Sequence, residues 1–334
     1  MKGLSTILSS VLKRALEAPK NIPANEIAGM LSLDDSAAWE EVFAAAREVR
    51  TRCGKDEILP RGLIECSNIC AKDCLYCGIR RSNAGAARYR LSEDEVRACC
   101  DEARRRGYHA VAFQAGEIES EANTRYYENL IGSCRDLEVT LSLGEQTEEV
   151  YRRWKTAGGD VMRYLIRIET SNRELYAKLH PPTCSFDRRV SCIRTLKRLG
   201  YVTGTGVMIG LPGQTVDDLA RDIVFFGDEN VDMVGMGPYI AHPDTPLHHP
   251  SPFTLSPFTL SPFHPFTLSL RMIALTRIYL HDVNIVAATA LEALDPGNGR
   301  QRGLDAGANV IMPNLTPAHA RDAYSLYPGK TTAE

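Results

Sequence analysis

From residue 58 onward, short uninterrupted apolar runs alternate with longer segments whose apolar residues recur at helical spacing. The apolar runs lie at 62–66, 109–114, 139–143, 163–168, 202–210, 231–237, 284–291 and 309–312. Several of the intervening segments end in glycine, the usual stop for a helix. Strands that alternate with helices predict a parallel sheet, and eight of them predict a (β/α)8 barrel of the TIM type, in the α/β class. An open doubly wound sheet is the alternative, but no turn after a strand carries the G-x-G-x-x-G motif typical of its dinucleotide-binding members.

Residues 1–57 differ from this pattern, because their apolar residues recur at helical spacing and they contain no strand-like run. We therefore expect an N-terminal helical extension over 1–57, followed by the barrel over 58–330. One segment interrupts the barrel pattern: residues 248–267 contain SPFTL twice in tandem and a third, altered copy. Proline at this density predicts an irregular loop. It could be a binding loop, but tandem copies are more typical of a slippage expansion without a chemical role.

The charge balance and the apolar stretches argue against nucleic acid and a membrane as partners. The chain has 39 basic and 42 acidic residues, which gives no reason to expect nucleic acid as a ligand. No apolar stretch approaches the roughly 18 residues that a membrane helix needs, and the N-terminus does not resemble a secretory signal. We therefore expect a cytoplasmic protein. In that compartment thiols stay reduced, and clustered cysteines bind metals more often than they form disulfides.

Three of the ten cysteines, Cys70, Cys74 and Cys77, follow the first predicted strand with the spacing C-x3-C-x2-C. This position is the carboxyl rim of the barrel, where barrel enzymes carry their chemistry. Three thiolates on one short loop suit iron or zinc. A structural zinc site needs a fourth ligand, for which Cys66 is a candidate, although it lies within the predicted strand. An iron–sulfur cluster held by three cysteines leaves one iron open, which indicates catalysis.

Charged residues also lie at the ends of other predicted strands. Glu117 ends the second strand in the turn QAGE. In the fourth strand, Arg163, Leu165, Arg167 and Glu169 alternate onto one face, which we expect to line the barrel. Buried charges are costly unless they are paired. Either these residues form a structural ion-pair network, or they hold a charged ligand with help from the following segment.

The cysteine motif, with an aromatic residue, Tyr76, before its last cysteine, resembles that of the radical S-adenosylmethionine (SAM) superfamily. The resemblance implies a [4Fe-4S] cluster whose open iron chelates the amino and carboxylate groups of SAM. It further implies that the reduced cluster cleaves SAM to a 5′-deoxyadenosyl radical. An electron donor such as a flavodoxin or ferredoxin is then a required partner.

Longer stretches resemble one branch of this superfamily, the HydE-type maturases of the [FeFe]-hydrogenase H-cluster. They include IECSNICAKDCLYCGIRRSN, VTLSLGE, RYLIRIETSN, GVMIGLPGQT and DMVGMGPYIAHPDTPL, and the resemblance runs from about residue 35 to the end. It implies a small iron–cysteine–carbonyl–cyanide precursor as substrate and other hydrogenase maturases as possible partners. Biotin synthase and methylornithine synthase are relatives, so a small-molecule enzyme like either of them is an alternative. A zinc-binding structural protein that uses Cys66 is an alternative from another class.

The resemblance also assigns roles to individual residues. Cys70, Cys74 and Cys77 would hold the cluster. Residues implied to contact SAM are Glu117, Arg167, Glu169, Arg189 and Met208, with Glu169 as the catalytic residue among them. A possible anion-binding cavity for the substrate would be formed by Arg61, Thr140 and Thr289, whose other interpretation is ordinary polar lining of the barrel. The chain departs from the branch at Cys66, where an aromatic residue is expected, and at Ala288, where a second threonine is common.

Overall fold

The fold is built on eight parallel strands, in a computed structural model that describes residues 2–159, 161–248 and 264–330. The strand order is β10-β1-β2-β3-β4-β5-β7-β9. The bounds are β1 Leu59–Ser67, β2 Ala110–Ala115, β3 Glu138–Ser142, β4 Met162–Leu165, β5 Val202–Thr205, β7 Met233–Val234, β9 Asn284–Ile285 and β10 Val310–Ile311. Apart from β10 and β1, which join the last strand to the first, neighbours in this order follow one another along the chain, as in a barrel.

The two edge strands of the sheet approach each other and nearly close the ring. Val286, directly after β9, forms a parallel bridge with Val310 of β10. The Ala287 N–H donates to the Val310 carbonyl at 2.9 Å, and the Asn309 N–H donates to the Ile285 carbonyl at 3.0 Å. A nearly closed parallel barrel with interleaved helices confirms the predicted fold class.

Several of the predicted strands are shorter than their apolar runs. The run 202–210 divides into β5 and β6 (Met208–Ile209), and 231–237 divides into β7 and β8 (Gly237–Pro238); β6 pairs only with β8. The division falls at Gly206, where an added Cβ would lie 1.8 Å from the Gly235 carbonyl oxygen. The prediction of a strand over 284–291 is wrong beyond Ile285, because helix α11 (Thr289–Leu294) begins inside it.

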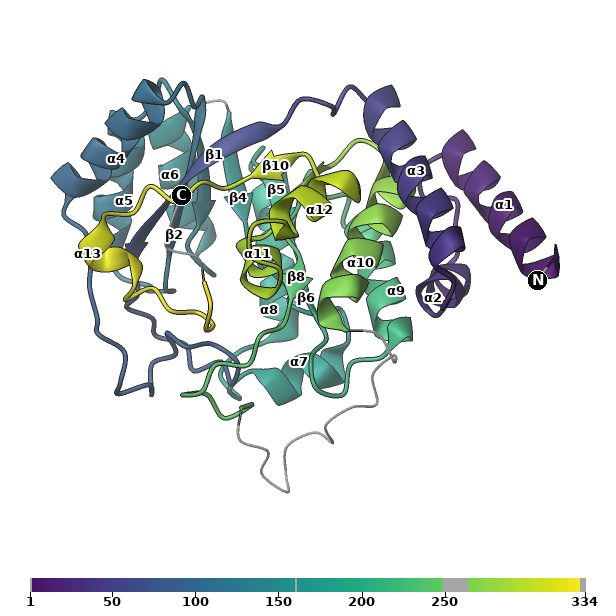
Figure 1. Ribbon diagram of the computed structural model, residues 1–334. Helices are drawn as coiled ribbons and strands as arrows, with labels where there is room; N and C mark the ends of the chain where they lie inside the picture. The colour runs from purple at the N-terminus through teal and green to yellow at the C-terminus, as the bar shows by residue number, and fades with distance from the viewer. Residues whose placement is uncertain (1, 160, 249–263, 331–334) are drawn as a thin grey trace.

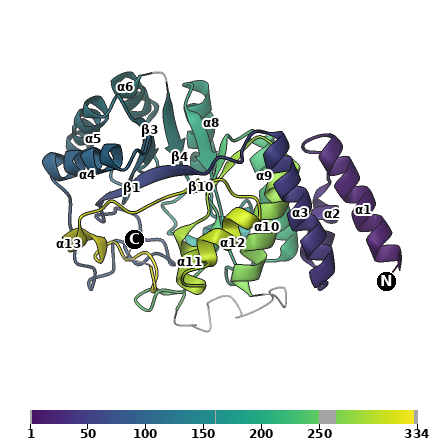
Figure 2. The ribbon, with the colours of Figure 1, turned by 45° about the horizontal axis from the view of Figure 1, so that its top comes forward.

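Helices cover the outside of the barrel (Figures 1 and 2). They are α4 Glu93–Arg105, α5 Glu121–Ser133, α6 Glu148–Gly158, α7 Arg173–Leu179, α8 Phe186–Arg198, α9 Val216–Asp228, α10 Pro265–Leu280, α12 Gly299–Asp305 and α13 Ala318–Arg321, besides α11. Side-chain caps fix where several of them start. Ser92 and Glu95 form a reciprocal capping box on α4, and Thr215 and Asp218 form another on α9.

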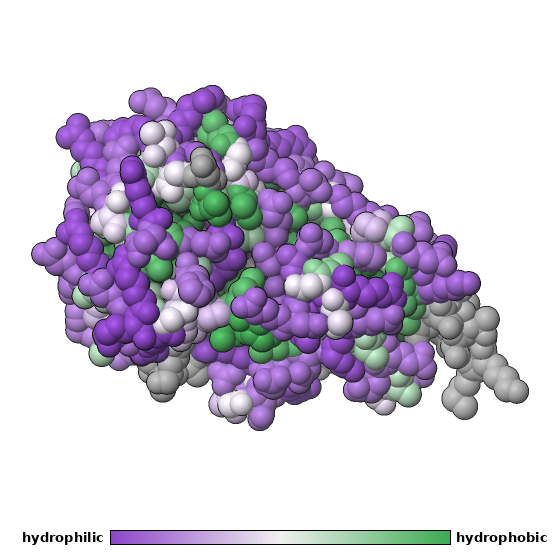
Figure 3. All heavy atoms as spheres, turned by 90° about the horizontal axis from the view of Figure 1, so that it is seen from above, coloured by the Kyte–Doolittle hydropathy of each residue, from purple (hydrophilic) through white to green (hydrophobic). Residues whose placement is uncertain are grey.

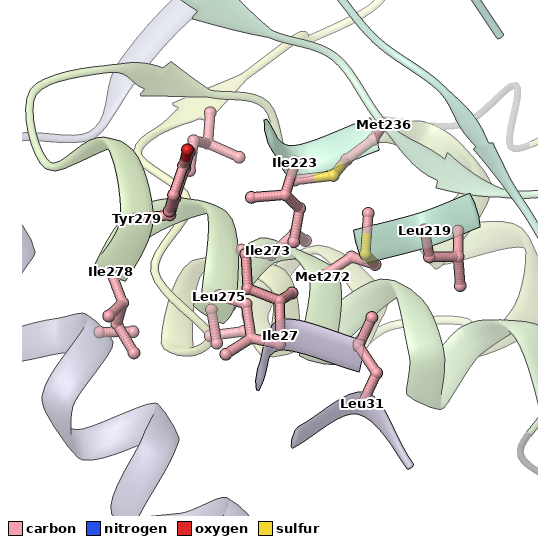
Figure 4. Packing of buried hydrophobic residues seen from close by; sticks show 14 of the residues in the cluster. Ile27, Leu31, Leu219, Ile223, Met236, Met272, Ile273, Leu275, Ile278 and Tyr279 are labelled. Atoms are coloured by element: carbon pink, nitrogen blue, oxygen red, sulfur yellow. The ribbon is translucent and has the colours of Figure 1, made fainter. Parts of the chain in front are cut away.

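The predicted N-terminal extension consists of α1 (Lys2–Glu17), α2 (Ala24–Leu31) and α3 (Ser36–Arg52). In the close view, Ile27 and Leu31 of α2 pack toward Leu219 of α9 and Ile273 of α10 (Figure 4). Each Å² of apolar surface that these side chains remove from water stabilises the fold by roughly 25 cal/mol. The extension therefore shares its hydrophobic core with one half of the barrel.

The predicted irregular loop, 248–267, lies mostly outside the described residues. Its last residues differ from the prediction, because α10 starts at Pro265. Proline is tolerated in the first turn of a helix, where its missing N–H would have no partner in any case. Among the described residues, no helix is long and apolar enough to cross a membrane. The face seen from above is largely hydrophilic, with smaller hydrophobic areas toward its centre (Figure 3).

Candidate active site

A cavity of about 340 Å³ lies inside the barrel. Arg61 in the first half of β1 lines it, and so do the cysteines that follow the end of that strand, so the cavity extends along the barrel toward the carboxyl rim. Every residue that the sequence analysis assigned to a site lines it: Arg61, Cys70, Cys74, Cys77, Glu117, Thr140, Arg167, Glu169, Arg189, Met208 and Thr289. The tertiary structure thus brings residues that are far apart in the sequence to one cavity.

The three cysteines lie on the loop between β1 and α4. The Cys70 Sγ accepts hydrogen bonds from the backbone N–H groups of Lys72 and Glu117, at 3.4 and 3.3 Å. Burial raises the pKa of all three thiols, that of Cys77 to about 12. A buried thiol with a raised pKa releases its proton readily only when a bound cation stabilises the thiolate in place of water.

The three thiols line the cavity, and the cysteine loop packs closely against the turn after β2. An added Cβ on Gly116 would lie 2.7 Å from the Cys70 Cβ and 2.3 Å from the Ile69 carbonyl oxygen, so the turn after β2 packs directly against the cysteine loop. An iron–sulfur cluster engages each thiolate through a different iron, which calls for sulfurs arranged around an open space.

Cys66, the candidate fourth ligand, is fully buried within β1 and does not line the cavity. Its Sγ lies 3.5 Å from the Ile64 carbonyl oxygen, and the side chain packs in the core between β1 and α4. Cys184 is a half-buried free thiol. It also lies outside the cavity lining, although its charge would contribute to the raised pKa of Cys74.

Arg167 and Glu169 form an ion pair, with Arg167 Nη2 3.0 Å from Glu169 Oε2. The expected strand alternation does not explain their position, because β4 ends at Leu165 and Glu169 has a φ of 65°. Arg163, predicted to share their face, instead pairs with Glu138 at 2.7 Å and does not line the cavity. Burial raises the pKa of Glu169, even though Arg167 lowers it. A cationic ligand beside Glu169 would offset the cost of burying its charged carboxylate.

Two charged residues near the rim were missed by the sequence analysis. Lys72, inside the cysteine motif, pairs with Glu117 at 2.9 Å, and the buried Glu145 accepts a hydrogen bond from Arg189 Nε at 2.6 Å. Gly144, with a φ of 75°, makes room for the Glu117 side chain, which an added Cβ would approach to 2.3 Å. The run LSLGE after the third strand contains both Gly144 and Glu145, so a signal was present in the sequence.

The polar residues further inside the cavity form two separate pairs. Arg61 Nη1 donates to Thr140 Oγ1 at 3.1 Å, and burial lowers the pKa of Arg61 to about 10. Thr289 Oγ1 lies 2.7 Å from the Tyr327 hydroxyl. Arg61 and Thr140 are therefore in direct contact, whereas the hydroxyl of Thr289 is engaged by the C-terminal segment.

That C-terminal segment is a second feature that sequence reasoning did not find. Tyr324, Leu326, Tyr327 and Lys330 line the cavity. The Lys330 ammonium pairs with Glu65 of β1, which is almost fully buried, and donates to the Tyr324 carbonyl at 2.9 Å. No periodic pattern marks these residues, because their contacts depend on the tertiary structure; Lys330 and Glu65 are 265 positions apart.

This barrel, with three cysteines on the loop after its first strand, has the architecture of a radical SAM enzyme, and the Radical SAM superfamily model matches residues 64–226. A [FeFe] hydrogenase maturase subunit HydE from Thermotoga maritima is 45% identical over 90% of this chain and 82% of its own length. The chain therefore belongs to the HydE-type maturase family within the radical SAM superfamily. This membership decides against the zinc-binding structural protein.

More distant relatives agree with the fold. A 3-methylornithine synthase from Methanosarcina barkeri is 25% identical over 91% of this chain and 82% of its own length. The crystal structure of a methylornithine synthase superposes with a TM-score of 0.77 at 23% identity, covering 97% of this chain and 88% of that one. At this identity the structural match supports the fold alone.

Proposed function

We propose that this protein uses a [4Fe-4S] cluster and SAM to act on a small iron-containing precursor during assembly of the [FeFe]-hydrogenase H-cluster. The observation that carries the proposal is a cavity that has three thiols at its rim and a buried arginine further inside. Membership of the HydE-type family supports a role in hydrogenase maturation. The precursor is expected to be an iron–cysteine–carbonyl–cyanide species.

Cys70, Cys74 and Cys77 would hold the cluster, which supplies the electron for reductive cleavage of SAM when it is bound. Glu117 and Glu169 provide carboxylates for the ammonium and sulfonium charges of SAM. Arg167 and Arg189 provide guanidinium groups, which suit a carboxylate because they can form two parallel hydrogen bonds. Met208, at the start of β6, lies on the cavity wall and would pack along the nucleoside.

The substrate would occupy the inner part of the cavity. The buried Arg61 guanidinium has Thr140 as its hydrogen-bond partner, which leaves donors for an anion or a carboxylate. Thr289, at the start of α11, would contribute its hydroxyl once Tyr327 moves or shares it. A pocket that is mostly apolar with a few placed polar groups is typical of small-molecule sites.

The proposal includes partners and a compartment. An electron donor such as a flavodoxin or ferredoxin must reduce the cluster, and other hydrogenase maturases would supply or accept the small precursor. A cytoplasmic location agrees with the ten cysteines, all of which are free thiols.

The test is anaerobic reconstitution with iron and sulfide, followed by EPR spectroscopy of the reduced protein with and without SAM. We expect a four-iron signal that changes when SAM is added, and production of 5′-deoxyadenosine. An unchanged spectrum would contradict the assignment of SAM to this site. Complementation of a strain that lacks its maturase then tests the substrate, because an enzyme like methylornithine synthase would not restore hydrogenase activity.

A further inference from the structure

Glu145 is a fully buried carboxylate that lies just behind the cavity wall. It follows Gly144, which lines the cavity, but does not line the cavity itself. Its Oε1 accepts a hydrogen bond from Arg189 Nε at 2.6 Å. Its Oε2 lies 3.2 Å from Arg188 Nε and 3.6 Å from Lys72 Nζ. Three cations from two different segments therefore surround one carboxylate that no ligand in the cavity can reach directly.

The energetics favour an ionised Glu145. Burial alone would raise its pKa, but Arg189, Lys72 and Arg188 together lower it below the ordinary value. An isolated buried carboxylate would instead take up a proton. Because the charge is kept, the strongest contact of Glu145, the bond to Arg189, is a charge-assisted one.

This bond fixes how Arg189 presents itself to the cavity. Arg189 Nε points to Glu145, and Nη1 donates to the Arg167 carbonyl at 2.8 Å. Nη2 lies 3.7 Å from Glu117 Oε2, too far for a hydrogen bond. Two sides of the planar guanidinium are thus held by the protein, and the side chain lines the cavity with donor capacity left over.

We propose that Glu145 is the positioning residue that orients the Arg189 guanidinium toward the carboxylate of SAM. The inference rests on the proposed function, in which Arg189 receives that carboxylate. Glu145 does not line the cavity, so its effect on the SAM carboxylate passes through Arg189. Substitution by Gln keeps the size but removes the charge, and it allows the amide to turn its NH2 group toward a cation. Arg189 then loses its fixed orientation.

The test compares two ligands that differ only in that carboxylate. Calorimetric titration of the anaerobically reconstituted protein is carried out with SAM and with decarboxylated SAM. For E145Q we expect SAM binding to weaken by roughly 10- to 100-fold, the usual effect of losing an orienting partner. Binding of decarboxylated SAM should change by less than about twofold, because it makes no use of Arg189. E145D, which keeps the charge, should recover part of the loss.

Glu119 offers a matched control. It pairs with Arg188 at 2.6 Å at the exposed end of the same group of charges. E119Q should leave the binding of both ligands unchanged. Equal weakening of both ligands in E145Q, together with a lower melting temperature, would assign Glu145 a purely structural role and overturn the inference. Unchanged SAM binding would overturn it too. Failure of the wild-type protein to bind SAM would instead refute the proposed function, on which the inference rests.

Discussion

The carboxylate of Asp222 accepts two hydrogen bonds from Ser171, one from its backbone N–H and one from its hydroxyl, both at 2.6 Å. Asp222 lies on α9, outside the barrel, and Ser171 lies two residues after Glu169. Asp218, one turn earlier on α9, accepts a hydrogen bond from the Asn172 side chain at 2.8 Å. Helix α9 therefore holds the segment that carries the Arg167–Glu169 ion pair at the cavity.

D222N should make the protein more stable at alkaline pH than the wild type. Burial raises the pKa of Asp222 to about 7, and its Oδ2 has no hydrogen-bond partner among the described residues. The folded state therefore favours the protonated acid, so the free energy of unfolding falls as pH rises from about 4 to about 7. Each unit of the shift corresponds to about 1.4 kcal/mol. Asn is neutral at every pH and should remove this dependence.

Urea denaturation at pH 5 and pH 8 measures the effect of D222N. The exposed neighbour Asp217 provides the control, since D217N should keep the wild-type pH dependence. Equal pH dependence in D222N and the wild type would contradict the prediction.

H180Q should reduce the loss of stability in mild acid. His180 Nε2 lies 2.9 Å from the Tyr76 hydroxyl and Nδ1 lies 2.8 Å from the Tyr176 carbonyl oxygen, so a neutral ring satisfies both contacts. Burial lowers the pKa of His180 to about 4. In the unfolded chain it is near 6.5, so the unfolded state gains protons first and stability falls as pH drops from about 6.5 to about 4.

Melting temperatures at pH 5 and pH 7.5 give the measurement for H180Q. The Gln amide oxygen can still accept from Tyr76, but it does not titrate. H319Q, at a largely exposed histidine, serves as the control and should behave like the wild type. The explanation fails if H180Q loses as much stability between the two pH values as the wild type does.

Replacing any one of Cys70, Cys74 and Cys77 by Ala should reduce bound iron and sulfide at least roughly tenfold after anaerobic reconstitution, because each thiolate holds a different iron. C66A is the matched control. Cys66 is buried in β1 and away from the cavity, so this variant should keep the wild-type iron content. Iron and sulfide analysis of the four variants tests this prediction. Loss of iron in C66A would indicate that Cys66 is a ligand.

R61M should separate SAM cleavage from maturation. Arg61 pairs with Thr140 in the inner part of the cavity. Loss of a charged hydrogen bond costs about 1.5–3 kcal/mol, so hydrogenase activity restored in a maturase-deficient strain should fall at least roughly tenfold. SAM cleavage in vitro should stay within about twofold of the wild type.

R163M is the control for R61M, because Arg163 pairs with Glu138 and does not line the cavity. It should restore hydrogenase activity as well as the wild type does. If R61M abolished SAM cleavage as well, the role of Arg61 in binding the substrate would be refuted.

Local patterns along the chain predicted the order and number of the principal strands, since each apolar run reflects burial of one segment. They failed where a long-range contact decides the local structure. The run 202–210 is interrupted because Gly206 meets Gly235 of a later segment, and the run 284–291 turns into helix α11 after Ile285. The contact between Gly206 and Gly235 leaves no signal within a window of ten residues.

The same division holds for the site. The spacing of Cys70, Cys74 and Cys77 on one loop is a local property, so the cluster ligands could be recognised from residues that are close in sequence. The partners of Arg189 and Glu65 could not, because Glu145 and Lys330 are 44 and 265 residues away from them. Which charges are paired is decided by burial in the folded barrel, where each buried ion requires a counter-ion brought to it by the tertiary structure.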